Sequence, residues 1–323
     1  MKPDLLAKKM ESQKDNALLL AILVVLIIVM SSLKDSFFTF NTFQSIAFQL
    51  PEMGILTLAM MITMITGGIN LSVIASANLS GILMALIMTR NIPEGQDNIG
   101  IVILAILAGM AVCLAVGVLN GVVIAYFRVP DILATLGTQM LINGICLVVT
   151  HGEVIAGYPP SFSAIGNGEL AFIPTPFWIF IICTIIMAVV LRRTSVGQQA
   201  YMYGSNPVAA RFSGVNTKKM LLKVYVLSGF FVGAAAMLLT SRFNSAAAGY
   251  AESYLLQAVL IAVLGGTDPN GGRGRVAGVV LAVIILQVVA SGLNLIRASQ
   301  YLTTALWGII LLLSVWMRMD KKR

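Results

Sequence analysis

Long apolar stretches, separated by short polar and basic segments, form the main pattern of this chain. Five segments carry no charged side chain: Met53–Thr89, Asn98–Phe127, Leu170–Leu191, Val276–Ile296 and Ala298–Met317. About 20 apolar residues in a helix are enough to cross the roughly 30 Å of hydrocarbon in a bilayer. None of the segments alternates between apolar and polar residues as a membrane strand does. The pattern therefore predicts an all-α, polytopic membrane protein.

Dividing the chain at its polar breaks gives about ten transmembrane helices. Their expected ranges are 16–33, 45–66, 70–89, 99–127, 130–150, 173–191, 221–242, 251–266, 275–296 and 300–317. Basic residues collect in loops that stay on the cytoplasmic side of a membrane. With the N terminus in the cytoplasm, four of the 21 lysines and arginines lie outside: Lys34, Arg90, Arg242 and Arg297. This distribution predicts cytoplasmic N and C termini and a single transmembrane domain over residues 1–323.

Composition agrees with a membrane protein and narrows the classes of function. Charged residues make up 11% of the chain, whereas soluble proteins have about a quarter. The net charge of +8 is explained by the placement of basic loops, so no nucleic-acid partner is expected. Cys113, Cys146 and Cys183 fall inside apolar segments, which predicts buried thiols. The sequence indicates no catalytic residue, metal site or cofactor site, because paired carboxylates, a histidine cluster and an activated nucleophile are missing.

A basic segment between the sixth and seventh predicted spans has the features of a contact surface. Residues 192–223 carry six basic side chains and no acidic one. Within this segment, Asn206 suits the cap of a short helix, Pro207 suits its first turn and Gly214 suits its end. A capped helix between spans predicts a rigid element to which a cytoplasmic partner docks. We call residues 192–223 the coupling segment.

A second cytoplasmic loop, rich in glycine and arginine, is expected at about 265–275. Its sequence Gly271-Gly272-Arg273-Gly274-Arg275 lacks the lysine and following hydroxyl with which a phosphate loop holds phosphates and Mg²⁺. We therefore expect no ATP hydrolysis by this chain. The loop is either a turn beside a partner or a flexible basic loop.

Uncharged polar side chains recur inside the predicted spans. The candidates to line a path for a neutral, hydroxyl-rich solute are Asn70, Ser72, Asn78, Asn120, Thr135, Asn143 and Asn294. The alternative is hydrogen bonding between helices, worth about 0.6 kcal/mol per bond, and it is the better interpretation for any single residue. Ionisable groups are rare in the spans. Glu52 and Glu252, near outer span ends, are interpreted as interfacial carboxylates that reach water, and the alternative is a gate or a group of an outer vestibule.

Four motifs follow one another along the chain. They are Thr66–Val73; Asn120-Gly121 with Val129–Thr138; Gly204–Asn216 with Val224–Gly229; and Leu264–Thr267 with Gly271–Gly274, followed by Ser291–Leu295. Together they resemble the permease subunits of bacterial ATP-binding cassette (ABC) importers for ribose, xylose, arabinose, galactose and related small molecules, including autoinducer-2. The resemblance covers nearly the whole chain. The family commonly has other residues at Asn70, Ile74, Asn143, Leu255 and Gln257, which leaves the substrate branch open.

The resemblance implies a type II-like importer permease in the bacterial inner membrane, without an ATPase site of its own. The implied partners are ABC ATPase subunits that bind ATP and Mg²⁺, a periplasmic or lipid-anchored solute-binding protein, a second permease copy (identical or similar) and membrane lipid. The implied coupling residues are Gly204, Asn206, Pro207, Ala210, Arg211, Gly214, Lys218 and Lys219. The expected solute is small, neutral and polar, a monosaccharide or a related compound. The alternative is a stand-alone secondary transporter or channel for small polar solutes.

Overall fold

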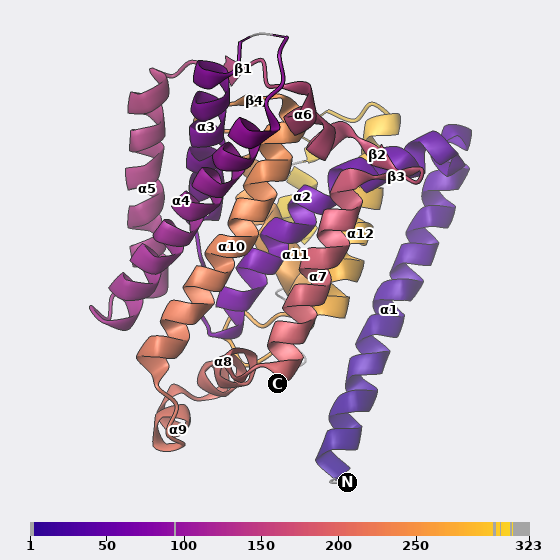
Figure 1. Ribbon diagram of the computed structural model, residues 1–323. Coiled ribbons are helices and arrows are strands. Elements are labelled where there is room, and N and C mark those ends of the chain that lie inside the picture. The colour runs from indigo at the N-terminus through magenta and orange to yellow at the C-terminus, as the bar shows by residue number, and fades with distance from the viewer. Residues whose placement is uncertain (1–2, 94, 300–301, 304, 311, 313–323) are drawn as a thin grey trace.

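The chain is mostly helical in the computed structural model, which describes residues 3–93, 95–299, 302–303, 305–310 and 312 (Figure 1). The α-helices are α1 (Pro3–Leu33), α2 (Phe40–Ile65), α3 (Val73–Asn91), α4 (Ile99–Ala125), α5 (Asp131–Thr150), α6 (Pro160–Asn167), α7 (Thr175–Arg193), α8 (Ser195–Ser205), α9 (Pro207–Phe212), α10 (Thr217–Phe243), α11 (Ser253–Leu264) and α12 (Val276–Leu295). A 3-10 helix, η1 (Asp35–Phe38), links α1 to α2.

Most of the predicted spans are present as helices. Within the described residues, seven helices are long and apolar enough to cross a membrane: α2, α3, α4, α5, α7, α10 and α12. Their ends lie within a few residues of seven of the predicted ranges. The first and eighth predicted spans correspond to shorter apolar helices, Asn16–Ser32 within α1 and all of α11. Half of the tenth, 300–317, lies outside the described residues, and so does the predicted cytoplasmic C terminus.

The helices run between two ends of an elongated bundle (Figure 1). One end carries α8, α9 and the start of α1, and we call it the α9 end. The opposite end, the α6 end, carries α6 and four strands: β1 (Ile155–Ala156), β2 (Glu169–Leu170), β3 (Ile173–Pro174) and β4 (Ser245–Ala246). The strands pair antiparallel, β1 with β4 and β2 with β3. The expectation of a purely helical chain is corrected only here, in short connections where the apolar pattern gives no signal.

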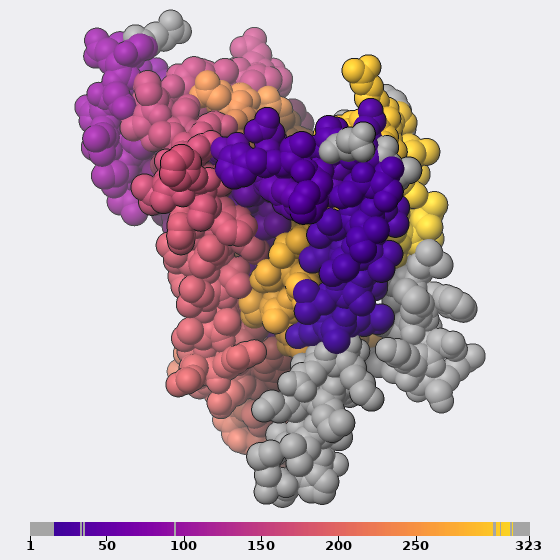
Figure 2. Space-filling view, turned by 90° about the vertical axis from the view of Figure 1, so that its right-hand side faces the viewer, coloured from indigo at the N-terminus to yellow at the C-terminus, as the bar shows by residue number. Residues whose placement is uncertain are grey.

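The core of the bundle is built around α2. Nearly all of its side chains from Leu50 to Ile65 are buried, and α7, α10, α11 and α12 pack against it. The helices α4, α5 and α7 are apolar but mostly exposed, as expected for surfaces that face lipid or another subunit. Figure 2 shows that α1 lies on the surface of the bundle, where it packs against α12.

Four glycines allow α4 and α10 to cross in backbone contact. Gly117 and Gly121 on α4 face the backbone of α10 at Tyr225 and Leu222, and Gly229 and Gly233 on α10 face α4 at Cys113 and Met110. A Cβ atom added to Gly117 would lie 2.6 Å from the carbonyl oxygen of Tyr225. Each helix thus contributes a pair of glycines four residues apart, the spacing that brings membrane helices together most closely.

We expect Gly229→Leu to separate α4 from α10, because its side chain would overlap the backbone of Cys113. Overpacking of this kind costs about 1–3 kcal/mol, so the melting temperature of the purified chain in detergent should fall. Gly144→Leu on α5 is the control, because a Cβ there meets nothing within 4 Å. Equal melting temperatures for the two variants would contradict the crossing.

Candidate functional site

The predicted helix of the coupling segment is present as α9, and its caps use the residues that the sequence indicated. The Oδ1 atom of Asn206 accepts hydrogen bonds from the backbone N–H groups of Val208 and Ala209, each at 3.0 Å. Pro207 lies in the first turn, where a proline interrupts no helical hydrogen bond. Gly214 follows the helix with a φ of +82°, a conformation that favours glycine. The prediction of a short capped helix is confirmed.

A second helix, α8, precedes α9 and was not predicted. Its N-cap is Thr194, whose hydroxyl accepts a hydrogen bond from the backbone N–H of Gly197. The helix ends at Ser205, directly before the N-cap of α9. Its sequence SVGQQAYMYGS has no clear apolar periodicity of the kind from which a helix is usually recognised. Short as it is, α8 connects the end of α7 to α9.

The surface of α9 is more apolar than the sequence analysis suggested. Phe212 is 90% exposed and Val208 is 61% exposed, whereas Ala210 is buried against the bundle. Val208 and Phe212 are four residues apart and therefore lie on the same face of the helix. The sequence analysis did not predict a role for either residue, because its argument rested on the caps and the basic side chains. The available signal was the pair of large apolar residues in an otherwise polar loop.

Three basic residues of the coupling segment, Arg211, Lys218 and Lys219, are exposed in α9 or in the first turn of α10. The Lys218 ammonium lies 5.3 Å from the centre of the Tyr126 ring, a distance at which the ring attracts the cation. The backbone N–H of Lys219 donates to Asn216, which caps α10. The α9 end thus presents two apolar side chains with cations beside them.

Three segments distant in sequence meet behind α9 in backbone contact. The N–H of Gly272 donates a hydrogen bond of 2.8 Å to the carbonyl oxygen of Ile65, the last residue of α2. A Cβ atom added to Gly204 would overlap the Ile65 carbonyl oxygen and the Gly272 nitrogen. A Cβ atom added to Gly271 would lie 2.9 Å from the Cα atom of Gly204 and 2.9 Å from the backbone nitrogen of Gly67. We call Gly67, Gly204, Gly271 and Gly272 the glycine junction.

A side-chain hydrogen bond strengthens the glycine junction. The hydroxyl of Tyr201 on α8 donates to the carbonyl oxygen of Gly274 at 2.7 Å. Burial raises the pKa of Tyr201 to about 12, so the hydroxyl keeps its proton at neutral pH and remains a donor. The junction therefore joins α8 to both the end of α2 and the loop 265–275. The loop is thus a turn packed against α8 and the end of α2, and its place beside a partner stays a prediction.

Four of the seven residues predicted to line a solute path belong to one buried region. Asn70 accepts from the Ser72 hydroxyl at 2.8 Å and donates to Ser228 at 3.2 Å. Asn120 donates to Ser72 at 2.8 Å and accepts from Thr138 at 2.7 Å. The Thr135 hydroxyl donates to the backbone carbonyl oxygen of Ile69 at 2.9 Å. In this conformation these groups connect the loop after α2 to α4, α5 and α10.

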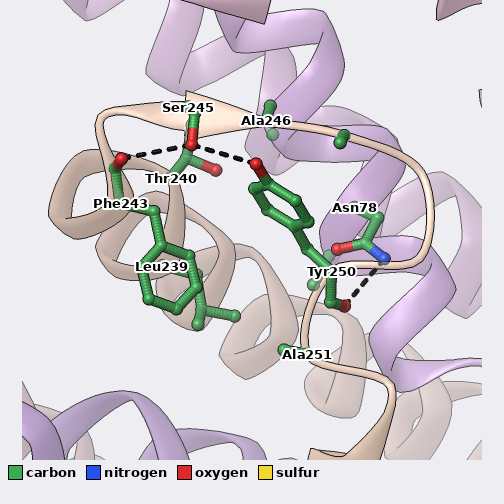
Figure 3. A pocket seen from close by; sticks show the side chains of 11 residues that line it. Asn78, Leu239, Thr240, Phe243, Ser245, Ala246, Tyr250 and Ala251 are labelled. Carbon is green, nitrogen blue, oxygen red and sulfur yellow. Dashed lines mark hydrogen bonds between the residues drawn. The ribbon is translucent and has the colours of Figure 1, made fainter. Parts of the chain in front are cut away.

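The other three predicted residues lie apart from this network. Asn78 donates to the carbonyl oxygen of Tyr250 at 3.0 Å, beside a cavity of 10 Å³ (Figure 3). That volume holds about one water molecule. Asn143 is half-buried on α5, and Asn294 is exposed near the end of α12.

Glu52 does not reach water, so its interpretation as an interfacial carboxylate was wrong. It is 2% exposed, and its Oε1 atom lies 2.9 Å from an Arg242 nitrogen. The Tyr254 hydroxyl donates to the same oxygen at 3.2 Å. The prediction failed because Glu52 lies well inside α2, on the side that faces α10 and α11, where Arg242 supplies the opposite charge. Glu252 is exposed, as expected.

Among the described residues, no group of three histidine, cysteine, aspartate or glutamate side chains is arranged to hold a metal ion. In the described part of the chain, Cys113, Cys146 and Cys183 are buried and form no disulfide bond. The α9 end thus carries a short capped helix, and the glycine junction joins the adjacent α8 to the end of α2.

Comparison with known proteins identifies relatives over most of the chain. Residues 42–315 match a family described as branched-chain amino acid transport system / permease component. The chain is 32% identical over 297 residues to the ribose import permease protein RbsC of Escherichia coli (strain K12), which covers 91% of this chain and 90% of the relative. It is 33% identical over 303 residues to RbsC of Bacillus subtilis (strain 168), covering 93% and 91%.

A further relative has a different solute in its name. The chain is 31% identical over 268 residues to the autoinducer 2 import system permease protein LsrD of Yersinia enterocolitica, which covers 81% of this chain and 78% of the relative.

We expect Arg242→Leu to destabilise the chain, because it leaves the Glu52 carboxylate buried without its opposite charge. Breaking a buried pair in this way costs about 3–5 kcal/mol. The double variant Glu52→Leu/Arg242→Leu should regain most of the loss, since it buries no charge. Melting temperatures in detergent measure both effects, with Arg90→Leu, exposed at the same end, as the control. A double variant no more stable than Arg242→Leu would contradict the pair.

Proposed function

Since the chain belongs to the family of branched-chain amino acid transport system permease components and is a transmembrane subunit of an ABC importer of the bacterial inner membrane, we propose that it imports a small neutral polyhydroxylated solute. The energy comes from separate ATPase subunits that bind ATP and Mg²⁺. The chain itself performs no chemistry and alternates between arrangements that open to one side of the membrane or the other.

The observation that carries the ATP-driven part of this proposal is the apolar face of α9. Two large apolar side chains on a capped, exposed helix are an unusual feature of a loop and mark a contact surface. We propose that Val208 and Phe212 insert into the ATPase subunit, while Arg211, Lys218 and Lys219 orient the approach of acidic groups on it. The caps at Asn206 and Gly214 keep the helix rigid enough to transmit a push.

The glycine junction supports a route for that push. ATP binding shifts the permease between arrangements only if the ATPase contacts the two arrangements differently. A displacement of α8 and α9 reaches α2 through Gly204, which packs against the backbone of Ile65 and Gly272. Ile65 and Gly272 are themselves joined by a backbone hydrogen bond. Because α2 is the central helix of the bundle, we propose that its end is where ATPase motion enters the membrane.

The arrangement of the remaining parts follows from the same proposal. The chain has about ten spans, with both termini and the α9 end in the cytoplasm. A solute-binding protein docks at the α6 end, and a second permease copy completes the translocation path. The polar network around Asn70, Ser72, Asn120 and Thr135 contacts solute only when α3, α4 and α5 separate, and Asn143 faces the path from the half-exposed side of α5.

The charges of the bundle favour a neutral solute. The family description names branched-chain amino acids, whose zwitterions need two opposite charges from the protein inside a membrane. Glu52 and Arg242 neutralise each other and leave neither charge for a solute. The relatives that match most of the chain are named for import of ribose and of autoinducer 2, which are consistent with a hydroxyl-rich solute.

The test is reconstitution in lipid vesicles with the ATPase and binding protein encoded beside this chain. We expect ATP hydrolysis to be stimulated by the binding protein loaded with D-ribose, and D-ribose or a related sugar to be taken up. Uptake driven by an ion gradient in the chain alone would contradict the proposal and favour a secondary transporter.

We expect Phe212→Ser to weaken binding of the ATPase subunit. Truncating a large apolar side chain at the centre of an interface costs about 2 kcal/mol or more, close to a thirtyfold loss of affinity. Co-purification at a series of ATPase concentrations measures the loss. Phe172→Ser, an exposed residue at the α6 end, should bind the ATPase as the wild type does. Equal binding by both variants would remove Phe212 from the interface.

We expect Gly204→Ala to separate ATP hydrolysis from transport. The added methyl group would overlap the carbonyl oxygen of Ile65 and the N–H of Gly272, which opens the glycine junction, while the exposed face of α9 stays intact. Hydrolysis should persist while uptake falls about tenfold, equivalent to about 1.4 kcal/mol. Gly214→Asn is the control, because asparagine tolerates a positive φ and nothing lies near that Cβ. Normal uptake by Gly204→Ala would contradict the coupling route.

A further inference from the structure

A partly open cavity with a mixed polar and apolar lining lies beside α2, away from the residues that the sequence analysis assigned to the path. It has a volume of 160 Å³ and lies between α2, α11, α12, Thr303 and Trp307. Its polar lining consists of Gln49, Tyr254, Gln257, Gln287 and Thr303. Val283, Leu286 and Gln287 of its lining belong to the middle of α12, one of the helices long and apolar enough to cross a membrane. The cavity is therefore beside the membrane-spanning part of α12.

The cavity has more hydrogen-bonding groups than its own walls use. Gln287 donates its amide hydrogen to Gln49 at 2.9 Å. Gln257 is half-buried and its side-chain amide makes no hydrogen bond to any described residue, so the amide is available to a solute. Each glutamine amide carries two donors and an acceptor oxygen. The lining is thus suited to hydroxyl groups, each of which both donates and accepts.

The lining carries no charged side chain among the residues described. The Tyr254 hydroxyl is directed to Glu52, whose charge is balanced by Arg242. An ionic solute would enter without an opposite charge, which is costly inside a membrane. A neutral solute is therefore favoured.

The size and the apolar part of the wall suit a small ring. An apolar cavity of about 150 Å³ holds benzene, so 160 Å³ accommodates a ring of similar size. Trp307 and other apolar side chains complete the wall. Small-molecule sites commonly combine apolar walls with a few placed polar groups.

We propose that this cavity is a binding site for a neutral polyhydroxylated ring compound, the class to which monosaccharides belong. The class of solute rests on the proposed function. The new element is the location, a site within one subunit with Gln257 as its main hydrogen-bonding group. None of the seven residues predicted for the path borders the cavity.

The test is protection of an introduced thiol in the full-length chain, in lipid nanodiscs, with the three native cysteines replaced by alanine. Gln257→Cys reports on the cavity, and Thr303→Cys, nearly unchanged in shape, reports from a second wall. Leu256→Cys is the control, because Leu256 is 66% exposed on the outer face of α11. The probe is D-ribose, with D-ribose 5-phosphate as the charged comparison.

We expect D-ribose to slow the reaction of a small neutral thiol reagent at positions 257 and 303. The slowing should be about threefold at a ribose concentration of about twice the dissociation constant, with no effect at position 256 and none from D-ribose 5-phosphate. Equal rates with and without D-ribose, D-xylose or D-galactose would overturn the site. So would protection by the phosphate that matches protection by ribose.

Uptake by the reconstituted assembly separates this proposal from the proposed function. Gln257→Leu removes the amide at similar size, and we expect its maximal uptake rate to fall about tenfold. Wild-type uptake by Gln257→Leu, in an assembly that transports, would remove the cavity from the path and leave the importer intact. An assembly without uptake in the wild type would contradict the importer itself, and the thiol experiment would still decide whether the cavity binds ribose.

Discussion

Close approach of backbones at glycine positions is the constraint on which this bundle depends. In lipid, apolar side chains gain little by leaving one apolar surface for another, so membrane helices associate through van der Waals contact and hydrogen bonds. Contact is closest where no Cβ atom intervenes. The α4–α10 crossing meets this condition at Gly117 and Gly229, and the α11–α12 crossing meets it at Gly265 and Gly278. The glycine junction extends the same principle from the membrane to the coupling segment.

The same constraint explains why the polar groups are arranged as they are. Helices that touch through their backbones leave little room for water, so buried polar groups need partners within the protein. Asn70 and Asn120 find them in neighbouring hydroxyl groups, and Glu52 finds Arg242. The cavity beside Gln257 is different, because the half-buried Gln257 amide makes no hydrogen bond to any described residue.

The sequence predicted the local features well and the long-range ones poorly. Span positions follow from apolar length, and the cap at Asn206 follows from residue types in one short stretch, so both were visible. The contact between Ile65, Gly204 and Gly272 joins positions more than 60 residues apart and leaves no local pattern. The burial of Glu52 has no local signal either, because its opposite charge comes from Arg242 on α10. The alternative given for Asn70, hydrogen bonding between helices, describes its observed contacts.

The central claim is that α9 moves together with the end of α2 and the loop 265–275 during the ATP cycle. Distances between spin labels at positions 213 and 270 of the reconstituted assembly, measured without nucleotide and with trapped ATP, test it most directly, because Ser213 is exposed directly after α9 and leaves Phe212 in place. The account predicts the same 213–270 distance in both states, together with a changed distance between labels at 213 and 172 at the opposite end. A 213–270 distance that changes with ATP would contradict the account, because α9 would then move independently of the glycine junction.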